Sequence, residues 1–568
     1  MTGAVNVLII EDIEQVAKGL EEQLSHFLPH GHAVLHSRNV EGALRQISSR
    51  RAEAFDLILC DFNLGENTNG QQLLEYLRVQ RLITRRTAFI MVTGESGYAS
   101  VASAVELGPD AYLLKPYTPN VLADRIRDAL ERREALKSVH QPLDRHEPDY
   151  LTAITACNAI ILEASRFALD ALRLKAECLL QQEKWGDAAT VYDKVLAWRS
   201  LPWAEVGRAR ALRHAGYAQV ALEKLKGTIK AHPQFVAAYD ELASLAQERG
   251  EQELAQRILE KAHGVVPSNR RARQLGLLAL DNGDLECAVR HLRVVVDRDR
   301  YGLVRSTEDF FGLAQGLRQL GRHDEALQAL DALNQHFPLT RPLTIRRQAA
   351  EAMVYQAAGH PERARQMLQQ AHADCAPHME PRTQLELAEA LHGCGDTATA
   401  QELFRHIAEN WHESAEIQMR LRQVVRRAGM SGEALAALEH TAQELIALNN
   451  RAASLIQSNR IQDAIDIMEE VAERLTHNTT VQSNYIQALL YWVENHAPPN
   501  LMQLREDTKP RRYLAIVREH LRRLAQVAPR HPRLSGFQGR FARLTGESQA
   551  GHDKPAFPEE AGSMEIRG

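Results

Sequence analysis

The sequence of 568 residues has few aromatic side chains, which make up only 5% of it. Hydrophobic residues reach 44% and charged residues 25%, close to the averages of soluble globular proteins, so the composition excludes wholesale disorder, collagen and a disulfide scaffold. β-Branched residues become sparse after about residue 120, whereas Ala, Leu, Glu, Gln and Arg are frequent, which is a helix-forming composition. We therefore expect most of the chain to be α-helical.

Paired cysteines and long apolar runs are also lacking. The six cysteines stand singly, with no Cys-x-x-Cys pair, so neither a zinc site nor a thioredoxin-like motif is expected. No window approaches the roughly 18 continuous apolar residues of a membrane span, and the N-terminus lacks a basic segment followed by an apolar stretch. The sequence therefore predicts a cytoplasmic protein with reduced cysteines and no membrane partner.

Charge of one sign is scarce as well, since the formal net charge is −5 and the pI is about 6.6. A net charge this small and negative would not by itself attract nucleic acid. One local excess stands out, because the segment 501–548 contains eleven Lys and Arg against four Asp and Glu. We prefer to interpret this segment as an exposed or partner-facing end of the chain, and a nucleic-acid site stays open as the alternative.

Five short apolar runs alternate with helical patterns over the segment 1–137; they lie at 5–10, 33–35, 57–60, 89–92 and 111–114. Continuous apolar strands between crossover helices indicate a parallel sheet that is covered on both faces. The segment 1–137 is therefore predicted to form an α/β domain with five strands. The following segment, 138–150, has two prolines and no apolar period, so we expect it to be a linker.

After about residue 151 a spacing of twelve between small side chains recurs. In one copy, Ala243 and Ala255 lie twelve apart, with Gly250 five positions before the second. The other pairs are 176 and 188, 209 and 221, 276 and 288, 314 and 326, 352 and 364, 388 and 400, and 452 and 464. Pro233 and Pro267 close two successive copies. The spacing predicts paired helices that approach closely at the small residues and are separated by a left-handed turn.

This pattern resembles the tetratricopeptide repeat, a helix–turn–helix unit of about 34 residues. The resemblance implies an all-α superhelical solenoid with a concave, protein-binding surface. We place repeats at 151–475, degenerate helical repeats with basic C-terminal helices at 476–548, and a disordered tail at 549–568. No phosphate-binding loop, nucleophile elbow, zinc motif or kinase signature follows position 137.

Polar side chains follow the predicted strands of the first domain. Glu11 and Asp12 come after the first strand, Asp61 after the third, Thr93 ends the fourth and Lys115 ends the fifth. In an open parallel sheet these ends meet at one edge, where ligands bind. Three carboxylates at this edge favour binding of Mg²⁺. The lysine and the hydroxyl would stabilise the negative charge of a transferred phosphoryl group.

This set resembles the receiver domain of two-component response regulators, over essentially all of residues 5–137. The resemblance implies a flavodoxin-like fold with strand order 2-1-3-4-5. It makes Asp61 the phosphoacceptor, a carboxylate nucleophile. Glu11 and Asp12 match the acidic pair that holds Mg²⁺ together with Asp61 and the backbone carbonyl of Asn63.

The same resemblance assigns roles to three further positions. Lys115 pairs with the phosphate, and its peptide bond to Pro116 is expected to be cis. Thr93 moves its hydroxyl onto a phosphate oxygen, and Tyr112 is the aromatic that rotates in response. Thr93 and Tyr112 together form the switch.

The combined interpretation is a response regulator with a tetratricopeptide output and no enzymatic activity beyond gaining and losing phosphate on Asp61. A histidine kinase or phosphotransfer protein is the expected donor. The hypothesis is that the face at 97–135 lies against the repeats near 151–230 and that phosphorylation alters this docking or promotes a homodimer, opening the concave surface to a protein partner. The alternative is a transcriptional or RNA-level regulator that contacts nucleic acid through 501–548.

Overall fold

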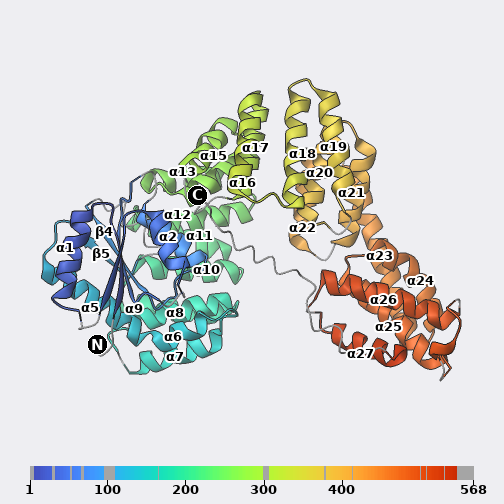
Figure 1. Cartoon of the computed structure of the whole chain (residues 1–568), viewed down its shortest axis with the longest axis horizontal. Helices are drawn as coiled ribbons and strands as arrows, with labels where there is room; N and C mark the ends of the chain where they lie inside the picture. The colour runs from blue at the N-terminus through green and yellow to red at the C-terminus, as the bar shows by residue number, and fades with distance from the viewer. Residues whose placement is uncertain are drawn as a thin grey trace, which may run out of the picture. The chain divides into compact units, whose positions relative to one another are not determined.

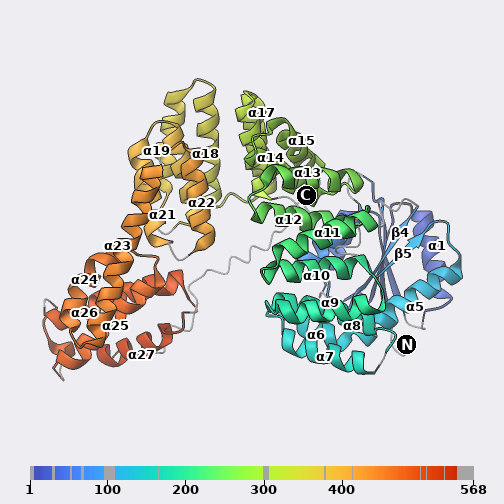
Figure 2. The same ribbon diagram turned by 180° about the vertical axis from the view of Figure 1, so that it is seen from behind.

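The chain divides into two units, Met1–Phe337 and Pro338–Gly568 (Figures 1 and 2). The structure is a computed structural model, and it describes residues 5–28, 32–50, 54–65, 69–94, 109–163, 165–298, 306–376, 379–411, 414–430, 432–498, 501–506, 508–529 and 531–546. The tail expected at 549–568 and part of the face expected at 97–135 lie outside these residues.

The first unit begins with a five-stranded parallel sheet in the order β2-β1-β3-β4-β5 (Figure 1). The strands are β1 (Asn6–Ile10), β2 (Ala33–Ser37), β3 (Leu57–Asp61), β4 (Ala88–Thr93) and β5 (Ala111–Leu114). The predicted flavodoxin-like order and all five predicted strand positions are confirmed. Apolar runs mark these strands because a strand covered on both faces has no polar side to interrupt it.

Helices cover both faces of this sheet. They are α1 (Glu14–Ser25), α2 (Val40–Ser48), α3 (Gly70–Val79) and α5 (Pro119–Ala135). Val7 and Ile9 of β1 point into a core shared with α1 and α5, whereas Leu8 and Ile10 point into the core shared with α2 and α3. All four side chains are fully buried, so the alternation along one strand builds both cores.

The segment predicted to be a linker contains a helix, α6 (Lys137–Leu143), and the prediction missed it. Val139 and Leu143 are buried in a core that also takes Cys157 from the next helix. Pro142 lies inside α6, which is why the sequence showed a breaker where the structure has a helix. The helix is stabilised by tertiary burial against later residues, which no local pattern of its own records.

In its described residues the rest of the first unit contains helices and turns but no strand, and it forms an all-α solenoid-like region. Its helices are α7 (Tyr150–Leu162), α8 (Ala168–Gln181), α9 (Trp185–Trp198), α10 (Pro202–His214), α11 (Ala218–Ala231), α12 (Val236–Glu248), α13 (Gln252–Val265), α14 (Asn269–Asp281), α15 (Leu285–Arg298), α16 (Thr307–Gln319) and α17 (His323–His336). Consecutive helices pack as antiparallel neighbours, as expected for short connections.

The spacing of twelve has the predicted structural meaning. The alanines of the pairs are at most 2% exposed, and each pair joins two successive helices. The turn residues adopt the left-handed conformation: Gly216, Gly250, Gly283, Gly321, Gly359, Gly395 and Asn459 have φ between 59° and 93°. In the first pair Glu183 takes this position, with φ 58°. Close helix packing and left-handed turns are thus confirmed as the basis of the pattern.

The second unit continues in the same manner. Its helices are α18 (Arg341–Ala357), α19 (Pro361–Asp374), α20 (Pro381–Gly393), α21 (Thr397–Asn410), α22 (Ala415–Arg427), α23 (Gly432–Gln457), α24 (Ile461–Arg474), α25 (Thr479–His496), η1 (Leu501–Gln503), α26 (Lys509–Val527) and α27 (Leu534–Thr545). Helix α23 has 26 residues, the longest of these helices, and contains Ala452 of the last pair. In the described part of the chain, no helix is long and apolar enough to cross a membrane.

Candidate functional site

The carboxyl ends of the strands bring the predicted polar residues to one edge of the sheet. Strand pairing aligns Ile10 with Cys60 and Thr93 with Leu114, so the residues that follow these positions emerge side by side. The backbone N–H of Lys115 donates to the carbonyl of Thr93 at 2.7 Å, which extends the β4–β5 pairing to the site itself. The fold therefore positions each side chain through a strand end.

Lys115 bridges two carboxylates at this edge. Its Nζ donates to Asp61 Oδ1 and to Glu11 Oε2, each at 3.0 Å. The side chain of Glu11 is 2% exposed and that of Asp61 is 11% exposed, so both charges are largely removed from water. One ammonium group thus compensates two buried carboxylates that would otherwise repel each other.

Burial and charge act in opposite directions on these groups. Burial raises the pKa of Asp61 and of Glu11, and the hydrogen bonds to Lys115 oppose this rise. Burial disfavours the charge of Lys115, but hydrogen bonds to Glu11 and Asp61 raise its pKa above the ordinary value. The site is an acid–base–acid triplet in which the lysine stays charged.

Three carboxylates can hold a divalent cation here. Oxygen atoms of Glu11, Asp12 and Asp61 lie within 4.8 Å of one another. Glu11 Oε1 is buried and has no hydrogen-bond partner among the described residues, so one lone pair of a buried acid is left for a ligand. Oxygen donors of this kind fit Mg²⁺, which prefers one or two carboxylates and keeps several waters.

Thr93 and Tyr112 lie on the two strands beside this site. Thr93, the last residue of β4, is 2% exposed. The hydroxyl of Tyr112 is buried without a hydrogen-bond partner among the described residues, and burial raises the pKa of this phenol. The Lys115–Pro116 peptide bond is cis. Asn63 lies just past β3 and forms a single bridge with Asn69.

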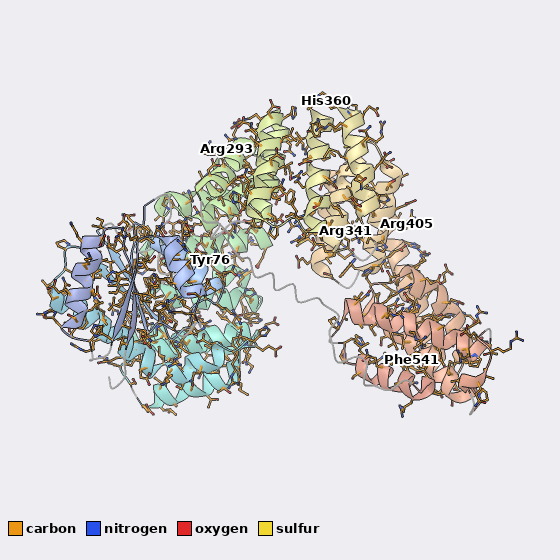
Figure 3. All side chains as sticks on the ribbon, in the orientation of Figure 1. Tyr76, Arg293, Arg341, His360, Arg405 and Phe541 are labelled. Carbon is orange, nitrogen blue, oxygen red and sulfur yellow. The ribbon has the colours of Figure 1, made fainter. Side chains whose placement is uncertain are left out.

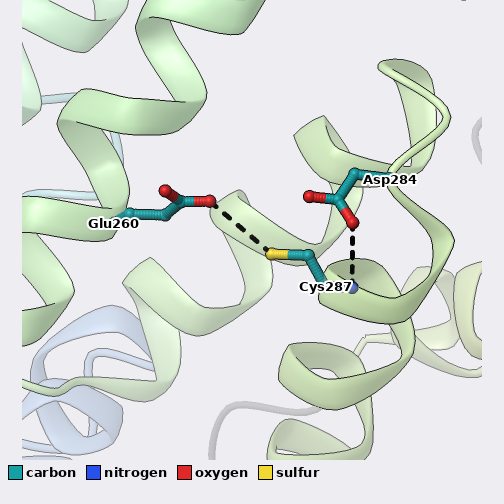
Figure 4. A group of neighbouring side chains, drawn as sticks. All are labelled: Glu260, Asp284 and Cys287. Atoms are coloured by element: carbon teal, nitrogen blue, oxygen red, sulfur yellow. Dashed lines mark hydrogen bonds between the residues drawn. The ribbon is translucent and has the colours of Figure 1, made fainter.

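Glu260, Asp284 and Cys287 form a second group of metal-ligating residue types (Figure 4). Cys287 Sγ donates to Glu260 at 3.8 Å, and Asp284 Oδ1 accepts from the backbone N–H of Cys287 at 3.2 Å. The Gln256 amide donates to both carboxylates, at 3.1 Å and 2.8 Å. Burial raises the pKa of Cys287 to about 11, which keeps the thiol protonated. The group is therefore explained by the packing of α13 on α15.

Basic side chains of the C-terminal segment hold partners within the chain. Lys509 donates to Gln462 at 2.8 Å and lies 5.1 Å from the Trp492 ring centre. Arg540 makes two hydrogen bonds to Glu494, at 2.9 Å and 2.6 Å. Further contacts are Arg511 with Glu506, Arg522 and Arg523 with Glu519, Arg533 with Gln487, and Arg518 over the ring of Phe541, which Figure 3 labels. The local positive excess is thus partly engaged in packing.

Asp110 is a buried charge that the sequence analysis missed. It stands just before β5, its side chain is 6% exposed, and it accepts from the Phe89 backbone N–H at 2.8 Å. Its carboxylate pairs with Arg133 of α5 and lies 3.8 Å from Arg78 of α3. Burial opposes its charge, but the two arginines hold the pKa of Asp110 below its ordinary value. Nothing in the sequence marks it except its place ahead of a strand.

Comparison with known proteins agrees with this geometry. Residues 7–127 match the family model of the response regulator receiver domain. A chemotaxis protein CheY homolog of Campylobacter jejuni is 35% identical over 78 residues, which are 14% of this chain and 58% of that protein. The chain thus spans a little over half the length of this relative.

Two solved structures are similar to parts of the chain. A receiver domain protein (CheY-like) of Methanospirillum hungatei is 26% identical, over 23% of this chain and 98% of that one, with a TM-score of 0.20. YrrB, a TPR protein, is 19% identical, over 34% of this chain and 95% of that one, with a TM-score of 0.30. The family model, the sheet order and the acidic edge agree on the N-terminal part: the chain contains, at residues 7–127, a response regulator receiver domain.

Proposed function

We propose that this protein is a two-component response regulator that accepts phosphate on Asp61 and answers by changing the protein contacts of its helical array. The observation that carries the proposal is the Lys115 bridge between Asp61 and Glu11 at the edge of the sheet. A buried carboxylate can act as a nucleophile towards phosphorus. The phosphoryl group that it gains would lie beside the ammonium group of Lys115, which can stabilise its negative charge.

The reaction proposed at Asp61 is phosphoryl transfer from a histidine kinase or phosphotransfer protein. A carboxylate oxygen of Asp61 bonds to phosphorus while the bond from phosphorus to the donor nitrogen breaks, and that nitrogen keeps the electron pair. Lys115 then pairs with an oxygen of the new phosphoryl group. Glu11, Asp12, Asp61 and the carbonyl of Asn63 would hold Mg²⁺, which when bound neutralises charge on the phosphoryl oxygens.

Thr93 and Tyr112 form the proposed switch. The Thr93 hydroxyl is buried at the end of β4, one strand away from Asp61, and would turn onto a phosphoryl oxygen. The buried hydroxyl of Tyr112 has no hydrogen bond to a described residue that would have to break, so its ring can change position at little cost. Their movement would transmit the change at the acidic edge to β4 and β5.

The helical array is proposed to be a tetratricopeptide-type solenoid. Its support is the buried small residue in each helix of a pair and the left-handed turn between them, repeated through both units. Such stacked pairs present their first helices on a concave surface, which suits an extended protein segment. The proposed output partner is therefore a protein.

Ion pairs join the receiver to the first helices of the array. Arg132 of α5 pairs with Asp170 of α8, and Arg166 pairs with Glu131 of α5. The Arg85 backbone N–H donates to Asp144, just past α6, at 3.2 Å. The two ion pairs support the docking proposed between 97–135 and 151–230. The contact of Arg85 with Asp144 lies outside these ranges and joins the start of β4 to the end of α6. Phosphorylation would alter this docking or favour a homodimer.

The test uses beryllofluoride with Mg²⁺, an analogue of the aspartyl phosphate, on the full chain. We expect hydrogen exchange to change at β4 and β5 and also in α6 to α8, because the docking contacts lie there. Asp61→Asn treated in the same way should show neither change. A receiver that binds beryllofluoride while α6 to α8 keep their exchange rates would contradict the coupling.

The nucleic-acid alternative is not favoured by any contact among the described residues, since basic side chains of 501–546 already pair within the chain. Measuring the affinity for random duplex and single-stranded nucleic acid at two salt concentrations separates the two functions. Binding that falls steeply with salt would favour the alternative.

A further inference from the structure

Helix α7 differs from the other α-helices in having no charged residue. Its sequence, YLTAITACNAIIL, contains no Asp, Glu, Lys or Arg, whereas every other α-helix of the described residues contains at least one. A helix that is apolar on all sides is normally buried on all sides. The lack of charge therefore predicts that every face of α7 is covered.

One face of α7 is nevertheless open to water. Ala153, Cys157 and Ile160 are buried where α6 and α8 pack against the helix. On another side Leu151 is 66% exposed and Leu162 is 85% exposed. The other exposed residues of the helix are Thr152, Thr155 and Ala159. Their spacings of three, four and seven put these five residues on one face, and α7 lies at the outer edge of the first unit in Figures 1 and 2.

The two threonines of this face already use their hydroxyl hydrogens. Thr155 Oγ1 donates to the Leu151 carbonyl at 3.0 Å, and Thr152 Oγ1 donates to the Asp149 carboxylate at 2.7 Å. Both hydrogen bonds stay within the helix and its N-terminal cap, so covering the face would leave neither donor unsatisfied. Removing this face from water is therefore favourable.

The place of α7 in the array makes an open apolar face unusual. The helix belongs to the first pair of the array, and the end of a stack of repeats normally presents polar side chains to water. Helix α27, the last helix of the described residues, follows this rule, because it exposes Ser535 and Arg543. The apolar face of α7 therefore indicates a surface that another molecule covers.

A second copy of the chain matches this face in shape. When two α7 helices lie antiparallel, Leu151 of one copy meets Leu162 of the other, and Thr155 meets Ala159. Both pairs meet at once because each has its midpoint at or next to Cys157. The small side chains lie in the middle and the leucines at the two ends, so the face is complementary to itself, as a two-fold contact requires.

Charges at the two ends of α7 favour the same arrangement. Arg145 lies at the N-terminal end, 3.3 Å from the N-cap residue Asp149, and its side chain is 63% exposed. Glu163 caps the C-terminal end and is exposed. An antiparallel pair would place Glu163 of each copy near Arg145 and near the partial positive charge at the N-terminal end of the other helix. A parallel pair would put like charges together.

We propose that this face of α7, from Leu151 to Leu162, is the contact between two copies of the chain, which pair antiparallel about a two-fold axis at the level of Cys157. A single short helix covers less than the roughly 800 Å² per partner of a standard interface. The dimer is therefore weak and forms in the micromolar range.

The receiver contacts the chain just past this face. Arg166, three residues after Glu163, pairs with Glu131 of α5 and lies 3.7 Å from Asp128 of the same helix. A change in the docking of α5 would thus act on the C-terminal end of α7. Regulation of the dimer by phosphorylation rests on the proposed function, whereas the dimer contact itself does not.

The test is sedimentation equilibrium of the full chain from about 1 to about 200 μM, in which the wild type should pass from monomer towards dimer. Leu162→Glu should weaken the association roughly tenfold or more, because a charge would enter each end of the contact. The leucine is exposed, so the substitution leaves the core intact. Leu254→Glu on α13 is the matched control, since it changes another exposed helical leucine, and it should associate like the wild type.

Cysteine cross-linking tests the antiparallel order. A mixture of Leu151→Cys and Leu162→Cys should form a disulfide-linked dimer under copper phenanthroline faster than either variant alone, because only the mixture brings two new thiols together. The wild type, in which Cys157 and Cys178 are buried, gives the background rate. Faster cross-linking of either variant alone would contradict the antiparallel pairing.

A wild type that stays monomeric over the whole range would overturn the proposal, as would equal association of Leu162→Glu and Leu254→Glu. Binding of the monomer to phosphatidylcholine vesicles that is lost in Leu162→Glu would also overturn it, because the face would then bind lipid.

Beryllofluoride with Mg²⁺ tests the regulation separately. A dimer that depends on Leu162 and is unaffected by beryllofluoride would support the contact and contradict its link to phosphorylation. Changed hydrogen exchange of α6 to α8 in a chain that forms no dimer would support the proposed function and contradict the contact.

Discussion

The receiver and the helical array use their residues in opposite ways. In the receiver, single charged side chains at strand ends determine what the domain can do, and Asp61, Glu11 and Lys115 are brought together from three strands. In the array, small side chains and left-handed turns recur, and no individual copy is special. In the receiver, a few charged residues determine the chemistry; in the array, recurring small residues and turns determine the architecture.

The largest expected effect breaks the chemistry of the receiver. Asp61→Asn should abolish covalent labelling by radioactive acetyl phosphate, because the amide is not a nucleophile for phosphorus. Asp56→Asn is the matched control, just ahead of the same strand. Its carboxylate accepts from the Asn6 N–H at 2.9 Å at the other end of β3, so labelling should persist. Labelling of Asp61→Asn at the wild-type level would show that another residue takes the phosphate.

Next in size is the removal of a buried charge. Asp110→Asn leaves Arg133 and Arg78 without their carboxylate and should lower the free energy of unfolding by about 3 kcal/mol. Asp124→Asn removes the same charge from an exposed pair with Arg127 and should change it by less than about 0.5 kcal/mol. Urea unfolding of both variants measures the difference. Similar losses would mean that burial does not distinguish the two pairs.

A change of shape tests the array. Gly207→Ala in α10 would press a methyl group against the buried ring of Tyr192, so we expect a loss of about 2 kcal/mol from overpacking. Gly227→Ala in the next helix meets nothing within 4 Å and should gain up to about 0.5 kcal/mol from helix propensity. Chemical denaturation compares the two. Equal stability of both variants would contradict the close approach of α9 and α10.

The pH dependence of stability tests the junction between the two regions. His140 of α6 is buried among Arg133, Arg85, Arg132 and Asp110; burial, with the three arginines, lowers its pKa to about 3. The unfolded chain takes up a proton near pH 6.5 while the folded chain does not, so stability falls as the pH drops from about 6.5 towards 3.

Between pH 7 and 5.5 we expect this histidine to contribute a loss of about 1 kcal/mol. His140→Gln should flatten that part of the urea-unfolding profile, whereas His214→Gln, at an exposed position, should leave it unchanged. A profile of His140→Gln that parallels the wild type would show that the folded protein accommodates the protonated ring.

The smallest effect sharpens the role of the turns. Glu183 has φ 58°, a conformation that glycine adopts without strain, so Glu183→Gly should raise the free energy of unfolding by about 0.5 kcal/mol. Gly250→Ala, at an equivalent turn with φ 75°, should lower it by about 1 kcal/mol. Thermal denaturation is sufficient for both. A loss from Glu183→Gly would mean that its side chain stabilises the turn.

The fold was predictable where the pattern is local. The strands of the receiver are continuous apolar runs because both faces are buried, and the alanines of the array keep one interval because paired helices must approach. The acidic edge followed from strand ends alone, since Asp61 and Lys115 each stand directly after an apolar run.

Features that depend on distant contacts were not predictable. Helix α6 is stabilised by a core shared with α7 and α8. It was not predicted because Pro142, which normally breaks a helix, lies inside it. Asp110 is a single polar residue ahead of a strand, and its partners Arg78 and Arg133 lie on two helices, α3 and α5. Neither of these features is accompanied by a periodic pattern of residues in the sequence.

The left-handed turns have a consequence for how such a chain can change in length. Gly216 and Gly250 occupy the same turn in two successive helix pairs, and a Cβ atom placed at either would meet nothing within 4 Å. Glycine is favoured at these turns by the left-handed backbone conformation and not by a lack of space for a side chain. A duplicated or deleted helix pair that begins and ends at these glycines would rejoin the array in the same geometry, so the length of the array can change independently of the receiver.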